Sequence, residues 1–243
     1  MRQNYKNFLS HKETAHNINA RLRIFICQYK RYKKLHKRPL KILDIGCGKN
    51  PEIFGHIFKE DKYYACDYYD SINKKIYSYQ QIDLNVEDIC KKFLYEKFDV
   101  IFCGEVIEHL FSPDYLVVKI RKMMKANSIL ILSTPNLGYY MNRIMFLFGL
   151  SPFFLENSSE YKFGRIFKFL GNRNGTEGHI RLFTFNALRE FLSYYHFDII
   201  KIISSTGPWE FFLDRVVSKF SPSLSATNIF VLKKARCQSI TKN

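Results

Sequence analysis

The stretch KILDIGCGKNPE, residues 41–52, decides the fold class of this chain. An apolar run that contains Asp44 leads into two glycines, Gly46 and Gly48, with Cys47 between them. A glycine turn that leaves a buried strand lets the backbone approach a nucleotide, because glycine lacks a Cβ and tolerates positive φ. The stretch therefore predicts a nucleotide-binding turn at the end of a buried strand.

Six more β-rich runs follow this one and alternate with helical stretches. The predicted strands cover residues 41–46, 63–67, 79–84, 98–104, 128–134, 197–203 and 228–234, and the clearest predicted helices cover 13–36, 112–125 and the residues after Thr184. This alternation predicts an α/β fold with a Rossmann-like, doubly wound sheet of seven mostly parallel strands and helices on both faces. Ligands of such sheets bind just beyond the carboxyl ends of the strands.

The positive charge of the chain is concentrated at its N-terminal end. Residues 1–41 hold twelve Lys/Arg and one acidic residue, so they carry +11 of the total net charge of +16. We therefore expect a basic helical extension over 1–40, one domain over 41–236 with a cap inserted at about 137–178, and a short tail over 237–243. The basic extension could meet nucleic acid, an anionic membrane or an acidic substrate, or it could be a solvated helix.

Cysteine usage and apolar run length predict a cytoplasmic protein. The six cysteines form no CxxC pair, which favours reduced thiols over a disulfide frame or a zinc site. The most apolar segment, residues 144–155, has twelve residues and includes a proline, whereas a membrane-spanning helix needs about 20. We expect no membrane span, while peripheral contact with a membrane stays open.

Two common nucleotide-binding motifs are excluded by the residues around the glycine turn. Pro51 stands where the dinucleotide fingerprint GxGxxG requires its third glycine, and no GK[ST] follows as in a phosphate-binding loop. Asp44 would repel a nearby phosphate but suits a ligand with positive charge. S-adenosylmethionine carries such charges on its ammonium and sulfonium groups.

LDIGCG resembles the first motif of the class I S-adenosylmethionine-dependent methyltransferases, although Asn50 replaces the last glycine of their pattern. EVIEH, STPN and HIRLFT continue the resemblance in the expected order as far as about residue 205. The resemblance implies that Asp67 binds the ribose hydroxyls, that Asp83 contacts the adenine amino group beside Leu84, and that Glu105 lies near the methyl group. The cofactor-binding set it implies is Asp44, Gly46, Cys47, Gly48, Asp67, Asp83, Leu84 and Glu105.

The candidate catalytic residues cluster after the fourth predicted strand. Glu105, Glu108 and His109 are spaced i, i+3, i+4, which places them on one side of a helical turn, and His179 could close over them. These four residues could bind Mg²⁺ or Mn²⁺. They resemble the Glu-x-x-Glu-His plus His set of the small-RNA 2′-O-methyltransferases, and ubiquinone-pathway O-methyltransferases are similar. Without a metal, Glu105, His109 and His179 are the expected catalytic residues, with an imidazole as general base.

Three functions remain open at this level. The first is O-methylation of a hydroxyl on a small-molecule or lipid- or sugar-linked acceptor. The segment 137–178, which mixes aromatic and cationic residues, would cover this acceptor. The second is metal-dependent 2′-O-methylation of RNA, which the basic N-terminal end favours. The third is a non-catalytic module that only binds the cofactor.

Overall fold

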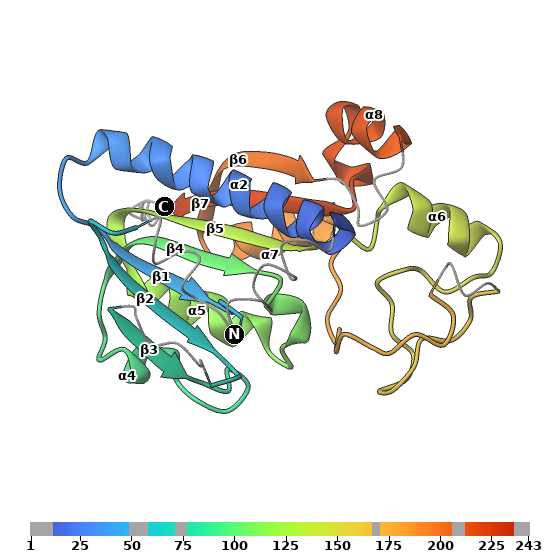
Figure 1. Cartoon of the computed structure of the whole chain (residues 1–243), viewed down its shortest axis with the longest axis horizontal. Helices are drawn as coiled ribbons and strands as arrows, with labels where there is room; N and C mark the ends of the chain where they lie inside the picture. The colour runs from blue at the N-terminus through green and yellow to red at the C-terminus, as the bar shows by residue number, and fades with distance from the viewer. Residues whose placement is uncertain (1–11, 49–57, 71–76, 167–170, 206–211, 236–243) are drawn as a thin grey trace, which may run out of the picture.

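A computed structural model describes residues 12–48, 58–70, 77–166, 171–205 and 212–235 (Figure 1). Seven strands form one sheet in the order β3-β2-β1-β4-β5-β7-β6. Neighbouring strands pair in parallel, except that β7 runs antiparallel to both β5 and β6. The strands are β1 (Lys41–Ile45), β2 (Lys62–Asp67), β3 (Ser78–Gln81), β4 (Phe98–Gly104), β5 (Met124–Pro135), β6 (Phe197–Ser205) and β7 (Thr227–Lys234). The predicted fold class is confirmed.

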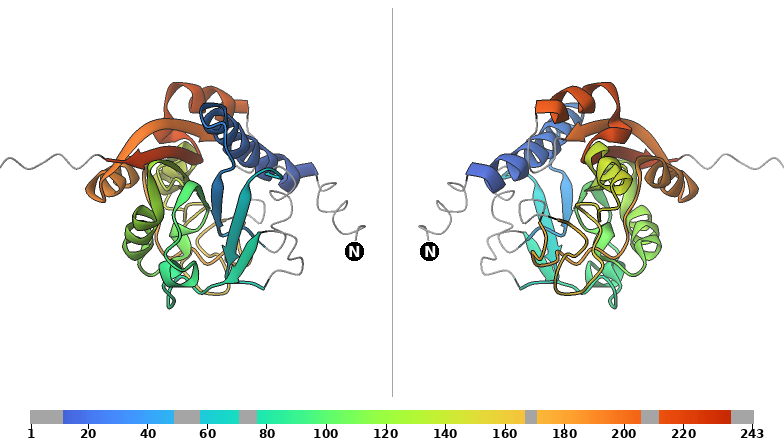
Figure 2. Two further views of the ribbon diagram at one scale, coloured as in Figure 1. Left: turned by 90° about the vertical axis from the view of Figure 1, so that its left-hand side faces the viewer. Right: turned by 90° about the vertical axis from the view of Figure 1, so that its right-hand side faces the viewer.

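Helices connect these strands and lie on both faces of the sheet (Figures 1 and 2). Their starts follow local capping: the side chain of Ser112 accepts from the N–H of Tyr115, and Thr184 caps the next long helix in the same way. The helices are α2 (Lys12–Leu35), α4 (Ile89–Lys92), α5 (Pro113–Met123), α6 (Tyr140–Leu147), α7 (Phe185–Tyr194) and α8 (Phe212–Phe220), with 3₁₀ turns η1 (Ile107–His109) and η3 (Pro222–Leu224). The helix predicted over 112–125 ends at Met123, because Met124 already pairs with Phe98 of β4.

The two faces of the sheet bury separate hydrophobic clusters. Side chains alternate along each strand, so Leu43 of β1 packs with α5 and α7 while Ile42 packs on the opposite face beneath α2. The α2 helix presents three buried aromatic residues to the sheet, and the ring of Phe25 stacks on Phe102 of β4 at a centroid distance of 5.4 Å. The helix predicted as an extension therefore covers one face of the central sheet.

Residues 137–166 and 171–183, between β5 and α7, lie at the right of Figure 1; they include the described part of the segment expected as a cap and are called the cap below. Its small core contains Tyr139, Met145 and Phe153. The buried guanidinium of Arg165 donates to the carbonyls of Ser151, Pro152 and Phe153, and so ties the irregular part of the cap together. The cap lies beyond the carboxyl end of β5, on the side of the sheet where ligands of this fold class bind.

Cys27, Cys47, Cys66, Cys90 and Cys103 are free thiols. Across the described residues, every helix is too short or too polar to cross a bilayer. Asn50 and Pro51 of the glycine turn, and Cys237 in the expected tail, lie outside the described residues.

Candidate active site

The glycine turn after β1 has the backbone that the sequence predicted. Gly46 and Gly48 both have a φ of +74°, which favours glycine. A Cβ on Gly46 would lie 2.3 Å from Cγ2 of Val106, whereas a Cβ on Gly48 would meet no other atom within 4 Å. Packing therefore requires glycine at position 46, while the backbone at Gly48 faces open space that a ligand can enter.

Two carboxylates stand at the ends of the neighbouring strands. Oδ2 of Asp67 accepts the N–H of Gly48 at 2.7 Å, and Oδ1 of Asp83 accepts the N–H of Asn85 at 2.9 Å. A cavity of about 450 Å³ opens between them and η1. Its wall includes six of the eight expected cofactor residues, namely Gly46, Gly48, Asp67, Asp83, Leu84 and Glu105, together with Tyr68, Tyr69, Ile82, Asn85, Val106, His109, Leu110 and Glu177.

Asp44 and Cys47, the other two expected cofactor residues, do not line this cavity. Asp44 is buried behind the turn, where Oδ2 accepts a hydrogen bond from the hydroxyl of Tyr63 at 2.7 Å. Burial raises the pKa of Asp44 to about 7, and the charge of Asp67 adds to the rise while the Tyr63 bond opposes it. The Cys47 N–H is directed to the carbonyl of Cys66.

Glu105 directly follows β4 and has a φ of +56°. Such a backbone is unusual for a residue other than glycine and is concentrated at functional sites. Its Oε1 accepts the hydroxyl of Ser133 at 2.8 Å and lies 3.4 Å from Nη1 of Arg21 on α2. Arg21 was not predicted as a site residue. Its position four residues before Phe25, on the buried stripe of α2, was the available signal.

Glu108, in η1, is fully buried. Oε2 accepts the hydroxyl of Thr134 at 2.9 Å, but Oε1 has no hydrogen-bond partner among the described residues. Burial, and after it the charge of Glu105, raises the pKa of Glu108 well above its ordinary value. A buried carboxyl oxygen without a partner suits an additional ligand with positive charge.

Two imidazoles lie next to this carboxyl group. Nδ1 of His109 lies 3.0 Å from the carbonyl oxygen of Gly178, and Nδ1 of His179 lies 3.1 Å from that of Phe154. Because a carbonyl oxygen only accepts, each neutral ring carries its proton on Nδ1 and its lone pair on Nε2. The ring centroids are 5.1 Å apart.

One ligand atom from each of Glu108, His109 and His179 lies within 4.8 Å of the others. Carboxylate oxygen and imidazole nitrogen are donors that suit divalent first-row metals, and backbone carbonyls on the opposite ring nitrogens are the usual supports of such histidines. The structure thus brings together three of the four expected metal ligands. Glu105 lies outside this group.

Sequence reasoning also missed Glu156, whose carboxylate receives three backbone N–H groups from residues 177–179. Burial would raise the pKa of Glu156, but these hydrogen bonds outweigh it and hold the pKa below its ordinary value. No spacing or composition in the sequence marks Glu156, because it contacts residues more than twenty positions away.

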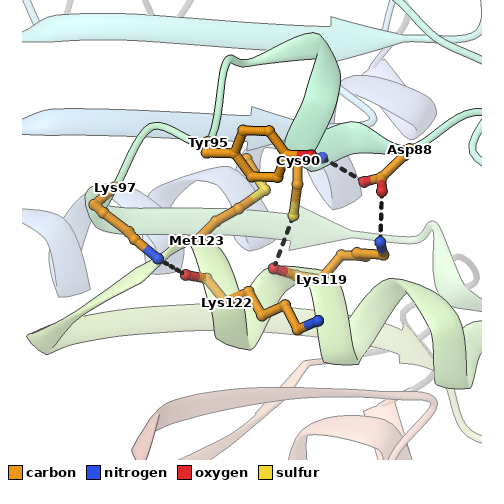
Figure 3. Close-up of a pocket in the computed structure, with 7 residues that line it drawn as sticks. All are labelled: Asp88, Cys90, Tyr95, Lys97, Lys119, Lys122 and Met123. Carbon is orange, nitrogen blue, oxygen red and sulfur yellow. Dashed lines mark hydrogen bonds and ion pairs between the residues drawn. The ribbon is translucent and has the colours of Figure 1, made fainter.

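A second hollow, of about 320 Å³, lies between α4 and α5 (Figure 3). Nζ of Lys119 pairs with Asp88 at 2.5 Å, and Nζ of Lys97 donates to the carbonyl of Lys122. Lys97 precedes β4 and Met123 precedes β5, so this hollow lies at the amino ends of those strands. It is separate from the cavity at their carboxyl ends.

Comparison with known proteins agrees with the fold. A family described as "Methyltransferase domain" matches residues 14–202. The ubiquinone biosynthesis O-methyltransferase of Glaesserella parasuis serovar 5 (strain SH0165) is 31% identical over 109 residues, which are 40% of this chain and 45% of that protein. The chain thus spans less than half the length of this curated relative.

Solved structures share the fold at low sequence identity. The plantazolicin methyltransferase BpumL, solved with S-adenosylhomocysteine, has a TM-score of 0.55 and 16% identity over 95% of this chain and 93% of its own. The 1,6-didemethyltoxoflavin-N1-methyltransferase of Burkholderia thailandensis has a TM-score of 0.53 and 11% identity over 97% and 87%. A methyltransferase from Archaeoglobus fulgidus has a TM-score of 0.53 and 16% identity over 87% and 94%. The chain belongs to the methyltransferase-domain family and, within it, to the class I S-adenosylmethionine-dependent methyltransferases.

Proposed function

We propose that this chain transfers a methyl group from S-adenosylmethionine to a hydroxyl oxygen of a small-molecule or lipid- or sugar-linked acceptor. The observation that carries the proposal is His109, which lines the same cavity as Asp67 and Asp83 and has a free lone pair on Nε2. An oxygen acceptor has a proton to lose, and a neutral imidazole is suited to receive it near neutral pH. The partial match to an O-methyltransferase also supports it.

The residues of the cavity fit S-adenosylmethionine. Asp67 can accept from the ribose hydroxyls and Asp83 from the adenine amino group, between the apolar side chains of Ile82 and Leu84. The amino-acid end of the cofactor carries a carboxylate and an ammonium group. Arg21 and Glu105, which pair with each other at 3.4 Å, offer charges complementary to both.

When bound, the cofactor supplies a methyl carbon activated by the sulfonium. Transfer of this carbon to the acceptor oxygen would leave the electron pair of the broken carbon–sulfur bond on the sulfur and give S-adenosylhomocysteine. Nε2 of His109 would take up the proton that the acceptor hydroxyl loses. The chain contributes mainly by placing the two reactants in line and by excluding water beneath the cap.

We further infer that Glu108, His109 and His179 can hold Mg²⁺ or Mn²⁺. The partnerless Oε1 of Glu108 and the two imidazoles oriented by carbonyls support this inference. A cation held there would lower the pKa of an acceptor hydroxyl. His109 would then be a ligand and not the base, so metal dependence separates the two arrangements.

The second candidate function is 2′-O-methylation of RNA. The exposed face of α2 carries Arg23, Lys30, Arg31 and Lys34 along one groove, and no acidic residue occurs between residues 21 and 37. Such a stripe is complementary to a phosphate backbone. RNA binding that weakens steeply between 50 and 200 mM salt would favour this candidate over the small acceptor.

The test is a calorimetric titration of EDTA-treated protein with S-adenosylhomocysteine, repeated with Mg²⁺ or Mn²⁺, followed by turnover on catechol, sugar, lipid and RNA hydroxyls. We expect S-adenosylhomocysteine to bind. Absence of binding would overturn both the proposed enzyme and the non-catalytic cofactor-binding module. If a metal is used, EDTA and Glu108→Gln should each abolish turnover, while the exposed control Glu160→Gln should not. Turnover that survives EDTA would leave His109 as the base, and binding without any turnover would favour the non-catalytic module.

A further inference from the structure

The peptide over residues 177–179 joins the cap to the catalytic turn. Three successive N–H groups converge on the Glu156 carboxylate: Glu177 on Oε1 at 2.7 Å, and Gly178 and His179 on Oε2 at 2.8 and 2.9 Å. Gly178 has a φ of +87°, which turns the successive N–H groups toward one point. Such a concavity of backbone N–H groups binds anions, and here a carboxylate of the same chain fills it.

Carbonyl groups of this peptide and of the segment before Glu156 contact the two imidazoles of the candidate active site. The carbonyl oxygen of Gly178 lies 3.0 Å from Nδ1 of His109 and accepts its proton. The carbonyl oxygen of Phe154, two residues before Glu156, lies 3.1 Å from Nδ1 of His179 and accepts its proton. Residues 154–156 therefore hold His179 at two points, by its ring and by its backbone.

On its other side, this peptide continues into contacts with the turn that carries Glu108. The N–H groups of Ile180 and Arg181 both donate to the Glu108 carbonyl oxygen, at 2.7 and 2.9 Å. These bonds fix the position of residues 180–181, but they leave the orientation of the Gly178 carbonyl free. The hydrogen bonds of Glu156 act on that peptide group directly.

We propose that Glu156 is a positioning residue that orients the rings of His109 and His179 through the 177–179 peptide, an inference that rests on the proposed function of His109 as base or of both histidines as metal ligands. Its side chain is 4% exposed, and Nζ of Lys162 lies 3.5 Å from Oε1. Glu156 does not line the cofactor cavity. It acts on the reaction through the two imidazoles.

Both side-chain oxygens of Glu156 must act as acceptors, because three N–H groups donate to them. Glu156→Gln preserves the size of the side chain but places an amide N–H₂ against at least one backbone N–H, and it removes the charge that faces Lys162. Glu156→Asp keeps the charge but withdraws it by one methylene. Glu160→Gln, an exposed change in the same segment with the same loss of charge, is the matched control.

The primary experiment reads the ring tautomers in the full chain, by long-range ¹H–¹⁵N spectra of ¹⁵N-labelled protein. Single His109→Asn and His179→Asn variants assign the two rings. We expect Nδ1–H in both rings of the unaltered chain and of Glu160→Gln, and a mixture of tautomers in both rings of Glu156→Gln. A ring of the unaltered chain whose single proton is on Nε2 would overturn the proposal without any variant, as would an unchanged spectrum of folded Glu156→Gln.

Turnover then separates this inference from the proposed function. We expect Glu156→Gln to lower kcat by about 10- to 100-fold, the range typical when a support of a ligand or base is lost, with a KM for S-adenosylmethionine changed less than about 3-fold. Glu156→Asp should recover part of kcat and give intermediate tautomer populations. Should Glu156→Gln not fold, spectra of Glu156→Asp identical to those of the unaltered chain would overturn the proposal. Altered tautomers with unaltered turnover would keep Glu156 as the positioning residue and remove the histidines from the mechanism.

Discussion

Replacing Asp44 by asparagine should stabilise the folded chain at neutral and alkaline pH but barely change it in acid. The buried carboxyl group of Asp44 has a pKa of about 7 in the folded chain, against an ordinary value of 3.8. The unfolded chain therefore releases the Asp44 proton at a lower pH than the folded chain does. The stability that the neutral form provides is complete below pH 4 and is lost as the pH rises to 7.

The size of the effect follows from the pKa difference. One pKa unit corresponds to about 1.4 kcal/mol, so a rise from 3.8 to about 7 removes about 4 kcal/mol of stability above pH 7. Asparagine can still accept the hydrogen bond of Tyr63 and does not ionise. We expect the difference in unfolding free energy between Asp44→Asn and the unaltered chain to grow from about 1 kcal/mol at pH 4.5 to about 4 kcal/mol at pH 8.

Urea denaturation of both proteins at one-unit steps from pH 4.5 to 8.5 measures this difference, with Asp198→Asn on β6 as the control for the loss of one exposed charge. A difference that stays constant across this range would refute the assignment of Asp44 as a neutral buried acid. Because a cationic cofactor favours the ionised form, binding of S-adenosylmethionine at pH 6 should also release a proton. Calorimetry in two buffers with different ionisation enthalpies detects that release.

Two further predictions concern the cofactor and the N-terminal helix. Asp67→Ala should weaken S-adenosylhomocysteine binding by about 100-fold, because a carboxylate that accepts from two hydroxyls contributes about 2–3 kcal/mol. Calorimetry on the folded variant measures this affinity. An unchanged affinity would refute the assignment of Asp67 to the ribose. Phe25→Ala should lower the free energy of unfolding by about 3–5 kcal/mol, because Phe25 is buried against Phe102 of the sheet. The exposed change Cys27→Ala on the same helix should stay within about 0.5 kcal/mol. Equal denaturation midpoints for the two α2 variants would mean that the helix does not belong to the folded unit.

The local order of elements was predictable from the sequence because each depends on neighbouring residues. The apolar run before Gly46 predicts β1, and the Ser112 and Thr184 caps predict where α5 and α7 begin. Asp67 and Asp83 could be placed at one cavity, because the carboxyl ends of adjacent parallel strands meet at one edge of a sheet. The spacing of Glu105, Glu108 and His109 predicted one group for all three, but Glu105 lies outside it, because its backbone, with a φ of +56°, is not helical and η1 begins only at Ile107.

The role of α2 was harder to predict, because its sequence is dominated by charge. The cations of the run from Tyr29 to Lys41 suggested an extension that either faces a partner or is a solvated helix. In the folded chain the buried aromatic stripe of α2 instead covers one face of the sheet and brings Arg21 to Glu105. Composition records how many cations a helix carries, but not which face of it another element will bury.

The sequence alone determined the order of strands and helices, the glycine turn and the carboxylates that follow it, since these depend on periodicity and spacing within a few residues. The resemblance had already grouped His179 with Glu108 and His109. Only the tertiary structure decided that Glu105 pairs with Arg21 instead of joining this group, and that Glu156 holds the peptide between the two histidines. The contact between His109 and Gly178 joins residues 69 positions apart. Such contacts depend on how the cap folds back over the strand ends, and no local pattern encodes that placement.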